Sequence, residues 1–495
     1  MPEIRITFTG LIAIVTGLIT TITGLVFVII ITRMLDPIDF GTWGIISAMF
    51  LSVLNIEPIV SYWTTREISR GIESAKTAIF ANGFLSSIAI FAFLIIAYVM
   101  GNNTDIDLQT ILTASLLIPL IFLNKILTAI NLGWKPHMVS YGLLVYSITQ
   151  IPMALIFVYY LDLGVYGIFY AIGIANLASI LVLTISSWEK IKNDFQKKFL
   201  KKWFKFSWLP FYPGIGGIIH SYDVIVFSLI VGTVEGIAFW TVAILLPNIV
   251  ANAGHVSSAV YTKLLKEGKI DNLQHNITLI FYFGFPLSAI AIVFAKPGLF
   301  ILNPIYEIVF PIVIILTIWT FLNTLSTVFQ NILKGTETVD INEKNGLIAH
   351  IKSKLFFLPT LLLIQYAIYI TSLTTVLLFT HSTSSQFELL LYWSIIYLLI
   401  QIPFTFYHFI MVRKETHISF EIKKIIKYFL ISLVVFSSMH FIIEQFLTYD
   451  ENIFTFLPNV LFFIIIGISA YIGISFFVDD RIKQLVLEII NEIKK

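Results

Sequence analysis

Ionisable side chains inside long apolar stretches are the residues of this sequence that could do chemistry. Asp223 follows His220 at a spacing of three, within the stretch 207–231. Because residues three apart share one face of an α-helix, the carboxyl and the imidazole could bind and release one proton near neutral pH. An ionised group at the bilayer centre costs about 2.5–3.5 kcal/mol on insertion scales, so the pair is a functional candidate. The alternative is a neutralised structural pair that holds the helix in place.

Glu57 and Lys125 are the other charged residues that stand out within apolar stretches. Glu57 is followed by Pro58, a residue type that perturbs a helix and could expose backbone carbonyls to a cavity. Lys125 lies between Asn124 and Thr128 in the sequence, and it could contact a substrate phosphate. It could instead extend its ammonium group to the membrane surface or pair with Glu57. Both residues are therefore candidates for substrate binding or for coupling to an ion.

A second set of polar residues recurs at spacings of four and three, and consists of Asn248, Asn252 and His255. This spacing places all three on one helical face. Amide groups suit hydrogen bonding to sugar hydroxyls, but polar contacts between helices are just as common in membrane proteins. The stretch 207–231 also contains prolines and several glycines, among them Pro213. We expect it to form a bent helix that moves.

These candidates lie in about fourteen apolar stretches, each long enough to cross a bilayer as a helix. Hydrophobic residues make up 58% of the 495 residues and charged residues only 12%, which is too much apolar surface for a water-soluble core. The sequence therefore predicts an all-α integral membrane protein. The expected spans are 8–32, 40–62, 78–100, 109–132, 139–161, 163–187, 207–231, 237–257, 276–295, 308–331, 355–380, 386–411, 427–446 and 457–478.

The cations of the chain sort into alternate loops. Lysine and arginine follow every second expected span, with seven lysines between Lys190 and Lys205, whereas acidic residues dominate the opposite loops. Only Arg33 and Lys296 break the pattern. By the positive-inside rule, we expect a multi-pass protein of the cell membrane with both termini in the cytoplasm.

The sequence also contains an internal repeat. Trp43 corresponds to Trp240 and Asn55 to Asn252, both at an offset of 197 positions. We expect two six-helix lobes related by a parallel repeat, and such repeats place the substrate pathway at the interface between the halves. The expected parts are a first lobe (1–187), a basic cytoplasmic linker (188–206), a second lobe (207–412) and two further spans with a cytoplasmic tail (413–495).

Several function classes are excluded by what the sequence lacks. The chain contains no cysteine, so it has no disulfide, thiolate metal site or cysteine nucleophile. It has no phosphate-binding glycine loop and no metal-ligand motif, so we expect no metal, no cofactor and no direct use of ATP. The net charge of +2 gives no reason to expect a nucleic-acid partner. We expect a protein that is not an enzyme.

The loop between the first two expected spans carries a motif. Residues 33–43 read R-x-L-x-P-x-x-F-G-x-W. This motif resembles the same loop of polysaccharide-biosynthesis flippases, which belong to the multidrug/oligosaccharidyl-lipid/polysaccharide (MOP) exporter superfamily. The segment from Asp223 to Trp240 is similar to the signature of that family's second lobe. The expected layout of two six-helix lobes followed by two further spans also resembles this family. By topology, the resemblance therefore extends over nearly the whole chain.

The resemblance implies a transport function and its partners. A flippase of this family moves a polyprenyl-diphosphate-linked oligosaccharide across the membrane by alternating access, for surface polysaccharide or glycoprotein glycan assembly. Its partners would be the lipid-linked glycan and membrane lipids. The related lipid II flippases line their cavity with several arginines on the first, second and eighth helices, whereas here only Arg33 and Arg66 lie beside the first two. Both are candidates for substrate contact, and the difference favours a glycan other than peptidoglycan precursor.

Two other functions stay open at this point. A small-molecule antiporter of the multidrug type, coupled to H⁺ or Na⁺, belongs to the same superfamily and could use the same acidic residue, although twelve spans are usual there. A polytopic glycosyltransferase or ligase would need paired carboxylates at a membrane face and normally a large outer loop, and the sequence shows neither. Asp36 and Asp39 are three residues apart, but the flanking Pro37 and Gly41 make a turn the simpler explanation.

Overall fold

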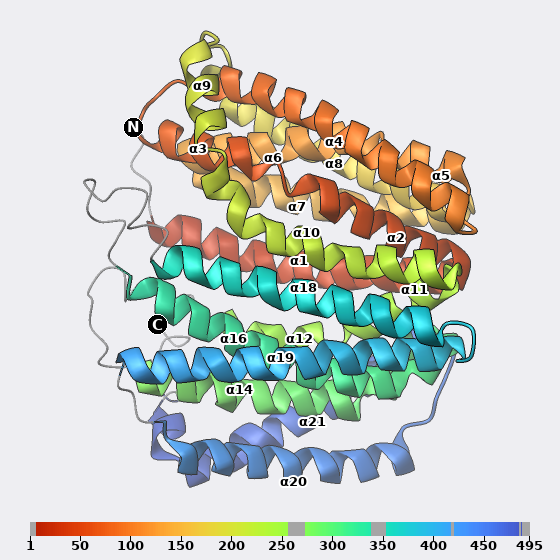
Figure 1. Ribbon diagram of the computed structural model, residues 1–495. Coiled ribbons are helices and arrows are strands. Elements are labelled where there is room, and N and C mark those ends of the chain that lie inside the picture. Colours follow the sequence, from red (N-terminus) through yellow and green to blue (C-terminus); the bar gives the residue numbers. More distant parts are fainter. Residues whose placement is uncertain (1–5, 256–272, 338–352, 417–419, 485–486, 488–495) are drawn as a thin grey trace. The chain divides into compact units, whose positions relative to one another are not determined.

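The computed structural model describes residues 6–255, 273–337, 353–416, 420–484 and 487. Every regular element in these ranges is a helix (Figure 1). Twelve helices are long and apolar enough to cross a membrane, and a thirteenth span results if the bent pair Ile277–Val293 and Ala295–Leu302 counts as one. The expected all-helical, multi-pass membrane protein is thereby confirmed. The count of fourteen spans stays a prediction.

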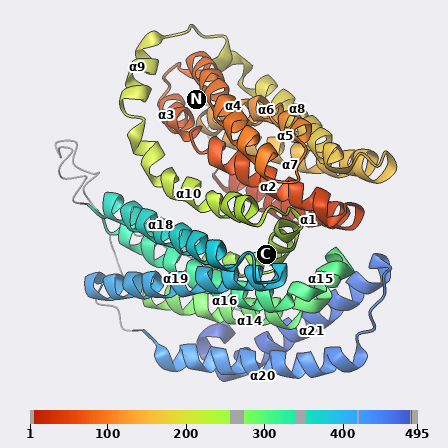
Figure 2. The ribbon, with the colours of Figure 1, turned by 45° about the vertical axis from the view of Figure 1, so that its right-hand side comes forward.

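The chain divides into two compact units, which we describe separately. The first contains Met1–Phe239 and Ile370–Thr383. Its long helices run side by side in both directions along one axis (Figure 2). Its elements are α1 (Ile6–Met34), α2 (Pro37–Leu54), α3 (Pro58–Ser69), α4 (Ala75–Asn103), α5 (Leu108–Ala114), α6 (Leu117–Trp134), α7 (Pro136–Ala154), the π-helix η1 (Leu155–Tyr160), α8 (Gly164–Ile191), α9 (Lys197–Lys205) and α10 (Trp208–Val231), together with the start of α11 (Glu235–Leu245) and the C-terminal part of α18 (Lys354–Thr380).

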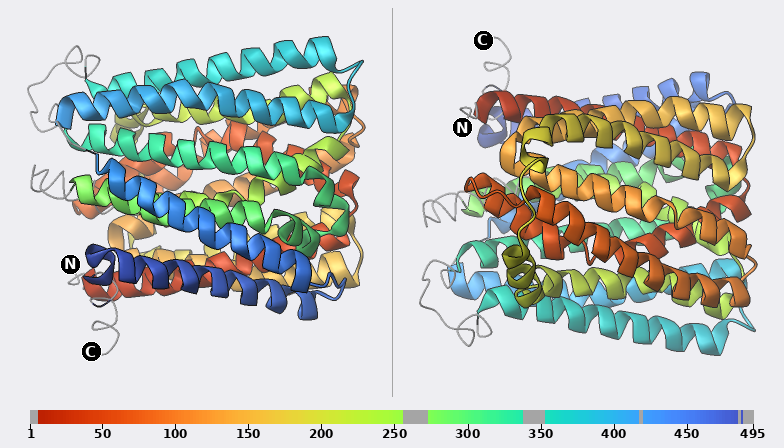
Figure 3. Two further views of the ribbon diagram at one scale, coloured as in Figure 1. Left: turned by 90° about the horizontal axis from the view of Figure 1, so that it is seen from below. Right: turned by 90° about the horizontal axis from the view of Figure 1, so that it is seen from above.

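The second unit contains Trp240–Tyr369 and Ser384–Lys495. Its long helices also run along one axis (Figure 3). Its elements, besides the remaining parts of α11 and α18, are α12 (Asn248–Ala251), the 3₁₀ turn η2 (Asn252–His255), α14 (Leu273–Val293), α15 (Ala295–Leu302), the 3₁₀ turn η3 (Pro304–Val309), α16 (Phe310–Gly335), α19 (Gln386–Thr416), α20 (Ile422–Phe446) and α21 (Ile453–Val478).

The motif in the first loop fixes how α2 begins. Asp36 caps the helix by accepting a hydrogen bond from the Asp39 amide at 2.7 Å, and Pro37 occupies the first turn. A side chain at Gly41 would overlap the carbonyl group of Val234, which precedes α11. Only glycine therefore allows the start of α2 to lie this close to that loop. The two aspartates form a turn and a helix cap, as the simpler explanation predicted.

Two of the spans of the first unit that contain proline differ in their continuity. α2 ends at Leu54 and α3 begins at Pro58, so the second span is interrupted at Glu57, where the sequence predicted a perturbation. α10 is one continuous helix although Pro213 lies inside it. It ends at Gly232, whose φ of 77° is in the left-handed region that glycine adopts readily. The bend and the movement expected of α10 stay predictions.

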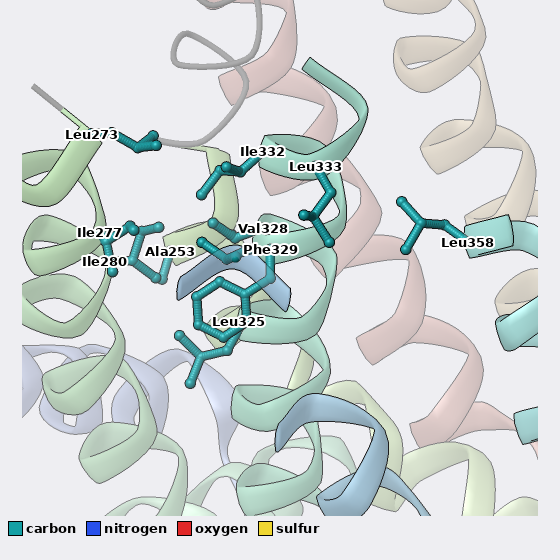
Figure 4. Close-up of a cluster of buried hydrophobic side chains, with 11 residues drawn as sticks. Ala253, Leu273, Ile277, Ile280, Leu325, Val328, Phe329, Ile332, Leu333 and Leu358 are labelled. Carbon is teal, nitrogen blue, oxygen red and sulfur yellow. The ribbon is translucent and has the colours of Figure 1, made fainter. Parts of the chain in front are cut away.

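The second unit packs around a cluster of eleven buried apolar side chains from η2, α14, α16, α18 and α19 (Figure 4). A stacked aromatic pair adds to this core, because the rings of Trp240 and Trp393 lie 3.8 Å apart between centroids. The last two helices, α20 and α21, are tied to α14. The Tyr471 hydroxyl donates a hydrogen bond of 2.9 Å to the Tyr282 carbonyl. These helices are thus part of the packed second unit.

Candidate functional site

The candidate site in the first unit begins where α10 packs along α2. The hydroxyl oxygens of Ser52 and Ser221 lie 2.9 Å apart, and both side chains are buried, so a hydrogen bond joins the two helices. Gly214 and Gly217 of α10 face Asn55, and a Cβ at either position would lie 3.8 Å from it. We call these five residues the α2–α10 seam. It combines small side chains with polar groups, which is typical of close helix contacts inside a membrane.

Asp223 and His220 are brought together on α10. The His220 Nε2 atom is 4.0 Å from Asp223 Oδ2, and the two side chains are 31% and 6% exposed, respectively. The other carboxylate oxygen of Asp223 accepts a hydrogen bond from the Val224 amide at 2.7 Å. The predicted pair therefore exists as a geometric pair, with a buried acid beside a partly exposed imidazole.

Glu57 lies in the break between α2 and α3, with 4% of its surface exposed. One carboxylate oxygen, Oε2, accepts a hydrogen bond from the Ser61 hydroxyl at 3.1 Å. The other, Oε1, is buried and has no hydrogen-bond partner among the described residues. A buried oxygen without a partner is costly, so Glu57 is ready to accept a proton, a cation or a donor group of a substrate.

The three predicted cations lie nearer to the surface of the first unit. Lys125 on α6 is exposed and acts electrostatically on Glu57. Arg66 on α3 is also exposed, and its guanidinium group lies 4.3 Å from the centre of the Tyr62 ring. Arg33 is half-buried in the last turn of α1. Lys125 is thus the predicted cation that the structure relates to the buried acid.

The predicted amide stripe belongs to the second unit. Asn248 begins α12 and Asn252 begins η2, and both side chains are exposed. His255 is the last residue of η2, and its side chain lies outside the described part of the chain. The two elements follow one another without a gap, and Asn248 and Asn252 lie in one candidate span, Glu235–Gly254. The shared face of the three residues stays a prediction.

Sequence reasoning missed a buried acid of the first unit and a buried histidine of the second. Glu67 on α3 accepts hydrogen bonds from Lys202 Nζ at 2.9 Å and from Trp203 Nε1 at 3.3 Å, both on α9. His408 on α19 is 1% exposed, and its Nδ1 atom is 2.9 Å from the Ser326 hydroxyl. His408 could have been found by the rule used for Asp223, because it lies in an apolar stretch. The partners of Glu67 could not, because they are distant in sequence.

No group of three or more histidine, aspartate and glutamate side chains in the described ranges could hold a metal ion. The site instead consists of the Asp223 and His220 pair on α10, the helix that forms the seam with α2, and of Glu57 at the interruption of the second span. Long apolar helices with these groups inside them define an all-helical, multi-pass membrane protein with polar chemistry within its spans.

Comparisons with known proteins identify the fold more closely. No family model and no curated protein sequence matches this chain. Among solved structures, it is similar to lipid II flippase MurJ in an inward closed conformation, at 18% identity and a TM-score of 0.64, over 95% of this chain and 100% of that one. It is also similar to an inward-facing multidrug resistance MATE family transporter of the MOP superfamily, at 15% identity and a TM-score of 0.57, over 82% of this chain and 99% of that one.

A third similar structure is a MOP superfamily transporter from Pyrococcus furiosus, at 12% identity and a TM-score of 0.51, over 81% of this chain and 94% of that one. At these identities the likeness establishes the fold. This chain therefore has the fold of MOP superfamily transporters, and the expected resemblance is confirmed at that level. Membership of the polysaccharide-biosynthesis flippases stays a prediction.

Proposed function

We propose that this protein is a flippase that carries a polyprenyl-diphosphate-linked oligosaccharide across the cell membrane by alternating access. The glycan would serve surface polysaccharide or glycoprotein assembly. The observation that carries the proposal is coverage: the lipid II flippase structure covers 95% of this chain, and the multidrug transporter structure covers 82%. The difference is close to the length of α20, α21 and their connecting loop. We take the solved structure that covers more of this chain as the better template for function.

The charge distribution supports the proposed orientation in the membrane. At the C-terminal ends of α6 and α8, Lys190 Nζ lies 4.3 Å from the centre of the Trp134 ring. Near the opposite ends, Asp107 caps α5 by accepting from the Thr110 amide, and the Thr110 hydroxyl is 2.9 Å from that of Tyr166. Cationic loops and acidic loops of the first unit thus lie at different ends of its helices. By the positive-inside rule, the cationic end and both termini would be cytoplasmic.

In this proposal the buried ionisable groups couple transport to an ion. Asp223 and His220 would bind and release H⁺ or Na⁺, and Glu57 would provide a second acidic position. An ion biases a transporter only if it binds the two conformations with different affinity. Burial of Asp223 beside a partly exposed histidine supplies a site whose hydration would change with conformation. The remaining candidates would contact substrate, through its diphosphate (Arg33, Arg66, Lys125) or its sugar hydroxyls (Asn248, Asn252, His255).

Depletion of the protein in its own cells tests the proposal. Synthesis of the lipid-linked unit would continue while translocation stops, so the complete unit should accumulate on the cytoplasmic leaflet and the surface glycan should disappear. Re-expression of the wild-type chain is the control. Accumulation of a shortened glycan instead would indicate loss of a glycosyltransferase, and normal surface glycan with no accumulated precursor would contradict a flippase.

The second candidate function is a cation-coupled small-molecule antiporter. It is favoured by the Asp223 and His220 pair, together with the fold shared with a multidrug resistance MATE family transporter. The two functions differ in cells. Loss of an antiporter would raise the sensitivity to exported compounds and leave the surface glycan intact.

A further inference from the structure

The segment between the eighth and tenth helices, expected to be a simple connector, forms an amphipathic helix. α9 contains five lysines among its nine residues, and its apolar residues recur at helical spacing. It lies transverse to α4 in two views (Figures 1 and 2). A helix with a basic face and an apolar face, running across the spans, has the features of a helix lying at a membrane surface.

α9 is anchored on the ends of α3 and α4 by specific contacts. Phe199 and Trp203 are the buried residues of α9 itself, and the Trp203 indole donates a hydrogen bond to the buried Glu67 carboxylate at 3.3 Å. Lys202 adds an ion pair of 2.9 Å to the same oxygen. Just before the helix, the Gln196 amide donates to the Thr77 hydroxyl at 2.8 Å. These contacts fix which residues of α9 face α4 and which face outward.

An open groove of about 560 Å³ remains between α4 and the α9 segment. Its walls are held by edge-to-face ring contacts, Phe80 with Phe195 at 5.8 Å and Phe84 with Phe204 at 6.4 Å between centroids. Lys201 is the one charged residue at the groove, and its side chain is exposed. The residues that line the groove are Phe80, Ala81, Phe84, Phe195, Leu200, Lys201 and Phe204.

We propose that this groove binds an anionic glycerophospholipid, with one acyl chain along the phenylalanines and the phosphate on Lys201. The apolar walls exclude a soluble anion, because nothing in them would replace its hydration. Lys201, at the groove itself, selects a negatively charged headgroup, as lysines of basic amphipathic helices do at anionic membrane surfaces. Bound lipid would fill the gap between α9 and α4 and so strengthen the attachment of α9. The proposal is independent of the transported substrate.

Lipid binding to the purified full-length protein tests this inference. We would measure, by native mass spectrometry, the retention of phosphatidylglycerol and of phosphatidylcholine with identical acyl chains. We expect the wild type to retain phosphatidylglycerol preferentially. Lys201→Gln should weaken that retention roughly fivefold, the effect of one cation near a lipid phosphate. Phe84→Ala should weaken retention of both lipids by a similar factor or more, because it removes an apolar wall.

Two matched variants control for charge and for hydrophobicity. Lys197→Gln removes a lysine from the same helix outside the groove, and Phe91→Ala removes an exposed phenylalanine from α4 outside the groove. Both should bind lipid as the wild type does. If Phe84→Ala is not monodisperse, Phe204→Ala replaces it, because Phe204 forms the opposite wall.

Three results would overturn the inference. Equal retention of the two lipids by the wild type would remove the headgroup selection. Losses in the control variants as large as those in the groove variants would show that binding is not at the groove. Displacement of phosphatidylglycerol by an equimolar polyprenyl phosphate would assign the groove to an isoprenoid chain instead.

Discussion

Replacing Asp223 with asparagine should abolish the ion dependence of transport and leave the protein folded. Asparagine has nearly the same shape as aspartate, and its carbonyl oxygen can still accept the hydrogen bond from the Val224 amide, which is 2.7 Å long. It cannot ionise, so the charge interaction with His220 is lost. Folding should persist because the seam serine pair, Ser52 and Ser221, is untouched.

The geometry sets the size of the effect. At the 4.0 Å separation of His220 and Asp223, two unit charges interact by about 4 kcal/mol at an effective dielectric constant of about 20. A shift between conformations from 1:99 to 99:1 requires about 5.5 kcal/mol. The pair can therefore supply a bias of up to about a thousandfold, and substrate binding must add the rest. We expect Asp223→Asn to keep slow, undriven exchange of substrate and to lose acceleration by an imposed gradient.

The assay uses proteoliposomes that contain a fluorescent lipid-linked oligosaccharide, with and without a pH or Na⁺ gradient. Asp223→Glu is the matched variant, because it retains an ionisable carboxyl and should retain part of the gradient response. Melting temperature in detergent confirms that each variant is folded. If the asparagine variant transports at the wild-type rate with an unchanged response to the gradient, Asp223 is structural, and Glu57 becomes the next acid to test.

Two further predictions concern topology and acid stability. The chain has no cysteine, so a single introduced cysteine reports the orientation of its loop. Lys198→Cys should react with an impermeant reagent only after the cells are opened, whereas Asp105→Cys should react in intact cells. The reverse pattern would contradict the topology. Burial would raise the pKa of Glu421, but a hydrogen bond from Lys424 and the charges of Lys424 and Arg481 outweigh it and lower that pKa below its ordinary value of 4.5. A carboxyl with a lowered folded pKa stabilises the protein above its unfolded pKa and loses this effect as the pH falls through the folded value. The melting temperature of the wild type should therefore drop more than that of Glu421→Gln between pH 6 and acidic pH, and equal drops would contradict the reasoning.

The helical membrane fold was predictable because it depends on local composition. An apolar window of about 20 residues has few alternatives to a membrane helix, and the interruption at Glu57 follows from the proline beside it. The His220 and Asp223 pair was predictable for the same reason, since a spacing of three on a helix fixes the geometry. Each of these features needs information from fewer than about 30 consecutive residues.

Contacts between distant segments were not predictable from the pattern. The Ser52 and Ser221 hydrogen bond depends on the register between α2 and α10, and nothing local to either serine specifies it. α9 was missed because a search for apolar windows ignores a short helix with only one apolar face. Its signal was the spacing of Phe199 and Trp203 among lysines. Lys296, an exception to the charge pattern, lies in the short helix α15 after a bend of 62°, where its ammonium group is 4.5 Å from the Phe310 ring centre.

The attachment of α9 has a mechanical consequence for α10. Only Phe206 and Ser207 separate the two helices, so the hydrogen bonds to Glu67 hold the first turn of α10 close to α3. If the N-terminal end of α10 is held in place, a rotation of the helix displaces its C-terminal end most. At a rise of about 1.5 Å per residue, Asp223 lies about 22 Å from the start of α10, and a tilt of about 10° about that point would displace it by about 4 Å. His220 and Val224 are on the same helix and would move together with Asp223, whereas Ser52 on α2 would not. A lever anchored at Glu67 would therefore turn a small rotation of α10 into loss of the Ser52 and Ser221 hydrogen bond and into new surroundings for the proposed ion pair.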